Sequence, residues 1–84
     1  MPYEVRIARA AEREIDRVPS LVRGRINHKI VTLESEPRPR GSKKLSGREE
    51  YRVRVGSYRV LYVVDDNTRV VVILAVGHRR DVYA

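Results

Sequence analysis

Apolar and polar residues alternate at the start of the chain and then repeat with a helical period. Residues 3–7 alternate, which predicts a short half-buried strand. Apolar positions then recur every three or four residues over 8–18 and again over 22–33, as in amphipathic helices. Pro19 ends the first helix, and Ser20 is expected to cap the second. So short a link predicts an antiparallel helix hairpin.

The next segment, residues 37–47, interrupts this period. It contains two prolines, two glycines, two serines and four basic residues. Such a composition does not extend a helix easily and predicts a mobile basic loop. Leu45 is its one large apolar residue and is expected to anchor it. The loop lysines, Lys43 and Lys44, are candidate RNA contacts.

The second half of the chain returns to a period of two. Residues 51–55 and 58–64 alternate, and the Gly-Ser pair at 56–57 suits a type II′ hairpin turn. A polar turn at 65–68 leads into the apolar run 70–76, which predicts a central strand buried on both faces.

The predicted order is therefore β-α-α-β-β-β. It indicates an α+β fold in which a curved, mainly antiparallel sheet carries the helix hairpin on one face. The 84 residues are expected to form one domain, residues 1–84.

The hairpin predicts a face rich in arginine. With a two-residue turn, Arg54 lies directly opposite Arg59 and Arg52 lies opposite Leu61, all on one face. Like charges directly across a strand pair are destabilising. A phosphate between the arginines would explain the arrangement, because guanidinium groups bind phosphate through paired hydrogen bonds. The alternative is that these arginines splay apart into water.

Charge and composition narrow the choice of partner. The net charge is +7; residues 1–37 hold seven basic and six acidic residues, and residues 38–84 hold eleven and five. This asymmetry favours a polyanion, most often nucleic acid, over an acidic membrane surface, an acidic protein or a merely solvated surface. The chain has no cysteine and only His28 and His78, so we expect no metal site and no cofactor. No apolar run is long enough to span a membrane, so we expect a cytoplasmic protein.

The C-terminal segment supplies candidate chemistry. Gly77 is expected to end the last strand with a sharp turn that brings His78, Arg79 and Arg80 toward the arginine face, with Tyr83 following. Cleavage of RNA by its own 2′-hydroxyl needs a base, charge stabilisation at phosphorus and an acid for the leaving oxygen.

Several side chains are candidates for these roles. Neighbouring cations favour the tyrosine anion, which makes Tyr83 a candidate base, and Arg79 is a candidate proton donor. His78 has the pKa for either role, or is structural. Arg80 is a further candidate RNA contact.

Other residues of these types are expected to be structural. His28 lies within the second helix and is expected to have no function. Three tyrosines, Tyr51, Tyr58 and Tyr62, lie on the opposite face of the hairpin and are expected to pack in the core rather than stack on bases.

Two stretches of sequence resemble the RelE/ParE superfamily of toxins from prokaryotic type II toxin–antitoxin pairs. The first runs from Leu45 to Tyr62 and the second from Val76 to Tyr83, and the order of elements fits as well. The likeness is to the RelE side of the superfamily. It implies a ribosome-dependent endoribonuclease that cuts mRNA in the A site, inhibits translation and is held in check by a cognate antitoxin.

The resemblance also implies roles for individual residues. Arg52, Arg54 and Arg59 would stabilise transition-state charge, Arg79 would donate a proton, and Tyr83 would act as base or stacking platform. The best-known RelE members have lysines where this chain has Arg52 and Arg54, which removes a lysine base and leaves Tyr83 or His78. The segment between Gly77 and Tyr83 is also shorter than in those members.

Two other functions remain open from the sequence. One is a ParE-like protein that inhibits DNA gyrase without cutting RNA. The other is a non-catalytic homologue that binds RNA or the ribosome.

Overall fold

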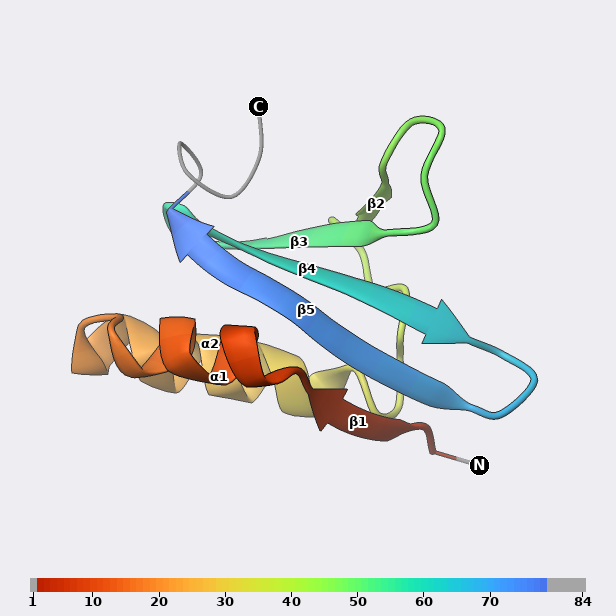
Figure 1. Cartoon of the computed structure of the whole chain (residues 1–84), viewed down its shortest axis with the longest axis horizontal. Helices are drawn as coiled ribbons and strands as arrows, with labels where there is room; N and C mark the ends of the chain where they lie inside the picture. The colour runs from red at the N-terminus through yellow and green to blue at the C-terminus, as the bar shows by residue number, and fades with distance from the viewer. Residues whose placement is uncertain (1, 79–84) are drawn as a thin grey trace.

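The computed structural model describes residues 2–78, which form two helices and one five-stranded sheet. In chain order the elements are β1 (Glu4–Ile7), α1 (Arg9–Asp16), α2 (Ser20–Thr32), β2 (Lys43–Lys44), β3 (Tyr51–Val55), β4 (Tyr58–Asp65) and β5 (Val70–His78). The strands lie in the order β1-β5-β4-β3-β2. β1 runs parallel to β5 and the other pairs are antiparallel. Figure 1 shows both helices on one face of the curved sheet, so the predicted α+β fold is confirmed.

The core lies between that face of the sheet and the helices. The predicted apolar stripes supply it, because Ala11 and Ile15 of α1 and Ile26 and Ile30 of α2 are buried. The sheet contributes the inward residues of its three longest strands, which are Val53, Val55, Val60, Tyr62, Val71, Ile73 and Val76. Burial of these side chains is what holds the helix pair against the strands.

The start of α2 differs from the prediction. Ser20 is the first residue of the helix, and the capping position is Pro19, which makes no side-chain capping bond. The reason is that the Pro19 carbonyl already accepts a hydrogen bond from the amide N–H of Arg23, at 2.8 Å. The expectation that Ser20 caps the helix was therefore wrong by one residue.

The segment after α2 is a loop that contains one short strand. Lys43 and Lys44 form β2, which pairs with Arg52 and Tyr51 of β3. Leu45 is buried, as expected of an anchor. At the other end the Tyr62 hydroxyl donates a hydrogen bond of 2.8 Å to the Pro37 carbonyl. The segment is thus tied to the sheet at both ends, and it departs from the predicted loop only in the two-residue strand β2.

An irregularity in β5 changes which of its residues face the helices. Leu61 pairs with Ala75 but the next residue, Tyr62, pairs with Ile73, so Leu74 is an extra residue on β5. Such a bulge bends the strand and shifts its alternation by one position. Before it, Val71 and Ile73 point inward; after it, Val76 does.

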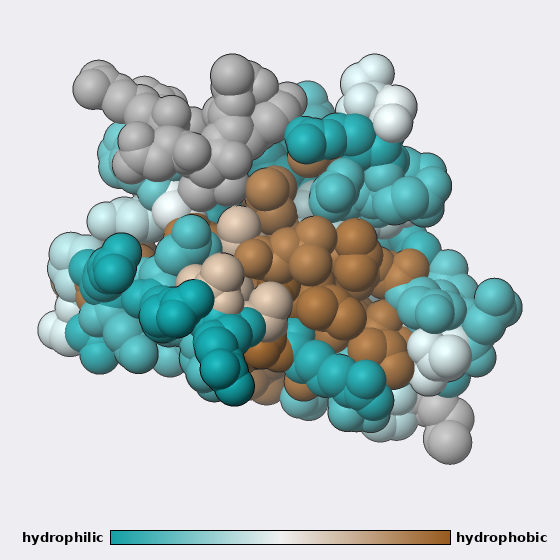
Figure 2. Space-filling model, in the orientation of Figure 1, coloured by the Kyte–Doolittle hydropathy of each residue, from teal (hydrophilic) through white to brown (hydrophobic). Residues whose placement is uncertain are grey.

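The outer face of the sheet, turned away from α1 and α2, is therefore not buried as the apolar run suggested. Its apolar residues on β4 and β5 are only half-buried: Leu61, Val63, Val70, Val72, Leu74 and Ala75. Figure 2 shows the resulting hydrophobic patch over these two strands. The prediction that β5 is buried on both faces was wrong.

Candidate active site

The hairpin of β3 and β4 has the predicted register. Gly56 adopts a φ of 59°, as the first turn position of a type II′ turn requires. Arg54 pairs with Arg59, and Arg52 pairs with Leu61. Because their neighbours Val53, Val55 and Val60 are in the core, these arginines lie on the outer face. We call Arg52, Arg54 and Arg59 the arginine face.

The three arginines differ in exposure. Arg52 is 8% exposed, and it is the one charged side chain among residues 2–78 that is buried. Arg59 is half-buried and Arg54 is exposed. On its other side Arg59 pairs with Gly77 of β5, which has no side chain to fill the space beside the guanidinium group. Three guanidinium groups on one face are complementary to a phosphate, whose oxygens accept paired hydrogen bonds.

The loop lysines divide between the two faces of the sheet. Lys43 pairs with Arg52 and so extends the arginine face onto β2. Lys44 pairs with Tyr51, which packs against the core, and therefore points to the helix side of the sheet edge. Both lysines are exposed. Of this pair, the structure brings Lys43 to the arginines.

His78 is not brought to the arginine face. It pairs with Tyr58 on the helix side of the sheet, and the two rings meet edge to face with their centroids 5.7 Å apart. The bulge at Leu74 accounts for this, because without it the alternation of β5 would turn His78 outward. The predicted sharp turn at Gly77 is also absent from the described chain, since β5 continues through Gly77 to His78.

The other C-terminal candidates, Arg79, Arg80 and Tyr83, lie outside the described residues. Their roles stay as the sequence predicts them. The arginine face as described thus contains the charge-stabilising groups of the predicted site, together with Lys43.

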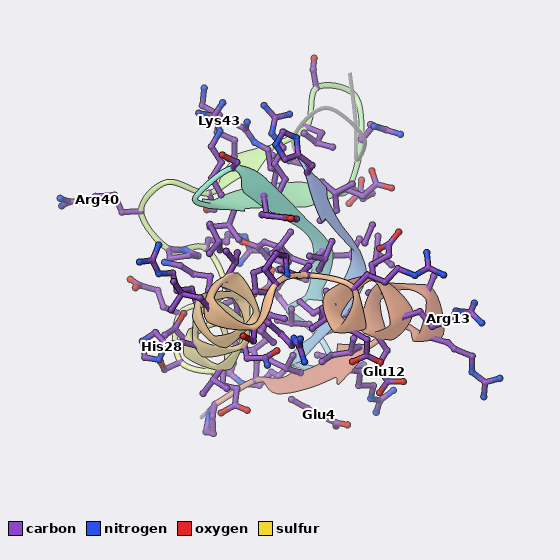
Figure 3. All side chains as sticks on the ribbon, turned by 90° about the vertical axis from the view of Figure 1, so that its left-hand side faces the viewer. Glu4, Glu12, Arg13, His28, Arg40 and Lys43 are labelled. Atoms are coloured by element: carbon purple, nitrogen blue, oxygen red, sulfur yellow. The ribbon has the colours of Figure 1, made fainter. Side chains whose placement is uncertain are left out.

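The remaining tyrosines and His28 lie where the sequence predicts. Tyr62 is fully buried, and its ring stacks on that of Tyr51 at 5.8 Å. Burial raises the pKa of the Tyr62 phenol. Tyr58 also packs against the core, while His28 is exposed on α2, as Figure 3 shows. Tyr62 is thus a core residue, while Tyr51 and Tyr58 are half-buried and pack against the core, as predicted.

Sequence reasoning missed a polar cluster at the opposite end of the sheet. Both guanidinium nitrogens Nη1 and Nη2 of Arg38 donate to Asp66, at 3.2 and 2.8 Å, and Nε donates to the Tyr51 hydroxyl at 3.0 Å. The Tyr3 hydroxyl donates to Asp66 at 2.6 Å. These bonds, led by those from Arg38, lower the pKa of Asp66 to about 2. Arg38 therefore serves the fold, although the sequence groups it with the basic loop.

Residues 2–78 have the features neither of a metal site nor of a membrane-spanning helix. No group of three His, Cys, Asp or Glu side chains there is placed to hold a metal ion. Over the same residues, no helix combines the length and apolarity that a membrane crossing requires.

Comparisons with known proteins agree with this architecture. The sequence model of the family described as "ParE toxin of type II toxin-antitoxin system, parDE" matches residues 5–83. Toxin RelG of Mycobacterium tuberculosis is 36% identical over 99% of this chain and 98% of its own length. A relative from Methanocaldococcus jannaschii, named "Putative toxin RelE1", is 31% identical over 99% of this chain and 97% of its own length.

Solved structures give the same result. A RelBE toxin–antitoxin complex of M. tuberculosis contains a chain 34% identical, with a TM-score of 0.83 over 94% of this chain and 100% of that one. The archaeal RelE–RelB complex of Pyrococcus horikoshii contains a chain that is 32% identical to this one. Its TM-score is 0.85, over 96% of this chain and 99% of that one.

The fold and the family match define a toxin of a type II toxin–antitoxin system. The chain belongs to the ParE toxin family of such systems, and within it the chain is RelE-like.

Proposed function

We propose that this toxin is a ribosome-dependent endoribonuclease that cuts mRNA in the A site and so inhibits translation. The observation that carries the proposal is the direct pairing of Arg54 with Arg59, with Arg52 and Lys43 on the same outer face. Four cations concentrated on one patch suit a phosphodiester under attack better than they suit a stable sheet.

In this mechanism the chain needs no covalent intermediate. The RNA 2′-oxygen attacks the adjacent phosphorus, its proton passes to a base, and the bond from phosphorus to the 5′-oxygen breaks as that oxygen takes up a proton. The products are a 2′,3′-cyclic phosphate and a 5′-hydroxyl. Arg54 and Arg59 would hold the extra negative charge at phosphorus, because guanidinium groups match phosphate oxygens in pairs.

The proton transfers fall to residues that the family resemblance names. Tyr83 would be the base and Arg79 the donor to the leaving oxygen. His78 is the weaker candidate for the base, since its ring packs against Tyr58 on the opposite side of the sheet.

The partners follow from the same proposal. The M. tuberculosis and P. horikoshii relatives were solved as toxin–antitoxin complexes, which supports a cognate antitoxin for this chain too. Its substrate would be mRNA on the ribosome, which would place its action in the cytoplasm.

The test is a purified translation system programmed with a defined mRNA, in which primer extension maps new 5′ ends. Cuts within A-site codons are expected for the wild-type chain and none for Arg59→Ala. Circular dichroism should show that the Arg59→Ala variant is folded. Arg25→Ala, an exposed arginine of α2, is the control and should cut normally. If the mRNA stays intact with the wild-type chain, or if Arg59→Ala cuts normally, the proposal fails. In the former case a gyrase supercoiling assay examines the ParE-like alternative.

A further inference from the structure

A second cationic site lies at the edge of the sheet, beside the arginine face. It is a cavity of about 310 Å³, lined by Lys29, Arg40, Gly41, Lys43, Arg52, Val53 and Arg54. Five of these seven residues are cations, and no acidic residue is among the described residues that line it. Two of them, Lys29 on α2 and Arg40 after it, were not expected to contribute to a site.

The cavity exists because β2 is short. β2 pairs only with Tyr51 and Arg52, so the outer edge of β3 from Val53 onward is not covered by a further strand within the described chain. The segment after α2 passes this edge, and Lys29 of α2 reaches the space from the helix side. Residues from a helix, a turn and two strands thus line one hollow.

Backbone contacts hold the turn that carries Arg40. Gly41 has a φ of 93°, and the Ser42 amide donates a hydrogen bond of 3.0 Å to the Pro39 carbonyl, which makes a tight turn between Arg40 and Lys43. Figure 3 shows Arg40 and Lys43 on the segment that leads from α2 to β2, with the Arg40 side chain extending outward from its turn. The bond from Tyr62 to Pro37 and the burial of Leu45 hold the ends of this segment.

Such a site is unfavourable for the protein alone. Like charges that line one cavity repel each other, and no acidic residue is among the described residues that line this one. A concave wall of one sign concentrates its field on the opening, which attracts anions. An oxyanion with several acceptor oxygens can bind several of the lysine and arginine donors around one cavity.

We propose that this cavity binds a second backbone phosphate of RNA, distinct from the phosphate that is cut. Arg52 and Arg54 belong to both the arginine face and the cavity, so one continuous cationic track leads from the outer face around the edge of β3 to Lys29 and Arg40. The identity of the anion as RNA rests on the proposed function. The phosphate belongs either to the mRNA strand or to ribosomal RNA, whose phosphodiesters are chemically the same.

The test compares the salt dependence of RNA binding for the wild-type chain and the variants Arg40→Gln and Lys29→Gln/Arg40→Gln. Arg9→Gln/Arg13→Gln is the matched control, since it removes two exposed cations of α1 outside the cavity. One probe is a single-stranded 2′-O-methyl RNA, which lacks the attacking hydroxyl. The other is ribosomes programmed with mRNA protected in the same way at the A site.

Loss of one phosphate contact should lower the slope of log K against log salt by about 0.7 and weaken binding by about tenfold at low salt. A drop with the free oligonucleotide assigns the phosphate to the mRNA strand, and a drop confined to ribosomes assigns it to ribosomal RNA. Either result supports the proposal. The single variant Arg40→Gln, in an exposed turn, guards against misfolding of the double variant.

Slopes for Lys29→Gln/Arg40→Gln that match those of the control with both probes overturn the proposal, as does a wild-type chain that binds neither probe. Cutting is scored separately. A wild-type chain whose slope depends on Lys29 and Arg40 but which never cuts mRNA would retain this site and lose the proposed nuclease activity. A wild-type chain that cuts mRNA normally, but whose slope does not depend on Lys29 and Arg40, would retain the proposed nuclease activity and lose this site.

Discussion

Arg54 on β3 lies directly opposite Arg59 on β4, so two cations face each other across the hairpin where an ion pair would stabilise the sheet. Opposite charges at such positions contribute roughly 0.2–1 kcal/mol, and like charges oppose folding by a comparable amount. The pairing of Arg54 with Arg59 therefore lowers the stability of the fold, whereas the proposed activity depends on it.

Replacing Arg54 with glutamate should raise stability and abolish cutting. The new carboxylate would pair with Arg59, which should increase the free energy of unfolding by about 0.5 kcal/mol. The same carboxylate would repel the phosphate and occupy the Arg59 guanidinium. Urea unfolding and primer extension measure the two effects. Arg25→Glu on α2 changes the charge equally and should leave stability within ~0.5 kcal/mol and cutting intact. Unchanged stability of Arg54→Glu would mean that the two arginines do not repel.

His78→Ala should retain mRNA cutting. The imidazole lies on the helix side of the sheet against Tyr58, on the face opposite Arg54 and Arg59, so it is badly placed to take a proton from the attacking hydroxyl. Primer extension at several pH values measures cutting, and Tyr83→Phe is the paired variant, for which we expect loss. A His78→Ala chain that melts normally but does not cut would transfer the role of base to His78.

The difference between the hairpin and β5 shows what sequence patterns can and cannot determine. The register of Arg54 and Arg59 was predictable because a two-residue glycine turn fixes which residues pair. The orientation of His78 was not, because the run before it is apolar throughout and no polar residue marks the bulge at Leu74. A strand with apolar residues on both faces carries no alternation from which its phase can be read.

Polar contacts between residues far apart in the chain could not be predicted from the sequence either. Arg38 and Asp66 are 28 positions apart, and the sequence groups Arg38 with its basic neighbours. The strand β2 contains only two lysines, so it has no apolar alternation of its own and forms because β3 offers an edge to pair with. The cavity lined by Lys29 and Arg40 depends on that same short pairing, which is why no local pattern indicated it.

The cluster around Asp66 should make stability depend on pH in a defined window. Hydrogen bonds from Arg38 and then from Tyr3 lower the Asp66 pKa from 3.8 to about 2. A carboxyl whose pKa is depressed on folding stabilises the native state above its unfolded pKa, and this contribution is lost as pH falls through the folded value. The wild-type chain should therefore lose the contribution of Asp66 between about pH 4 and pH 2.

Asp66→Asn isolates this effect. The difference in free energy of unfolding between wild type and Asp66→Asn should be greatest above pH 5 and shrink toward pH 2. Urea titrations at intervals of half a pH unit measure it. Asp16→Asn, at the end of α1 and outside the cluster, is the matched substitution. A wild-type advantage over Asp66→Asn that stays constant from pH 5 to pH 2 would show that Asp66 is not held by Arg38 in solution.

Two glycines should respond in opposite directions to the same substitution. At both Gly24 and Gly56 an added Cβ would meet no atom within 4 Å, so packing cannot decide the outcome. Gly24 lies inside α2, where alanine is favoured over glycine by about 1 kcal/mol, so Gly24→Ala should stabilise the chain by about that amount. Gly56 has a φ of 59°, where alanine costs about 1–2 kcal/mol, so Gly56→Ala should destabilise it.

The consequences for the site should differ as well. Gly56 sets the turn that places Arg54 opposite Arg59, so Gly56→Ala should reduce cutting by more than its loss of stability explains, whereas Gly24→Ala should cut normally. Gly56→Asn is the informative third variant, because asparagine tolerates positive φ and should recover part of both losses. Thermal melts and primer extension on the three variants measure this. Equal stability of Gly56→Ala and wild type would contradict the turn geometry on which the arginine face depends.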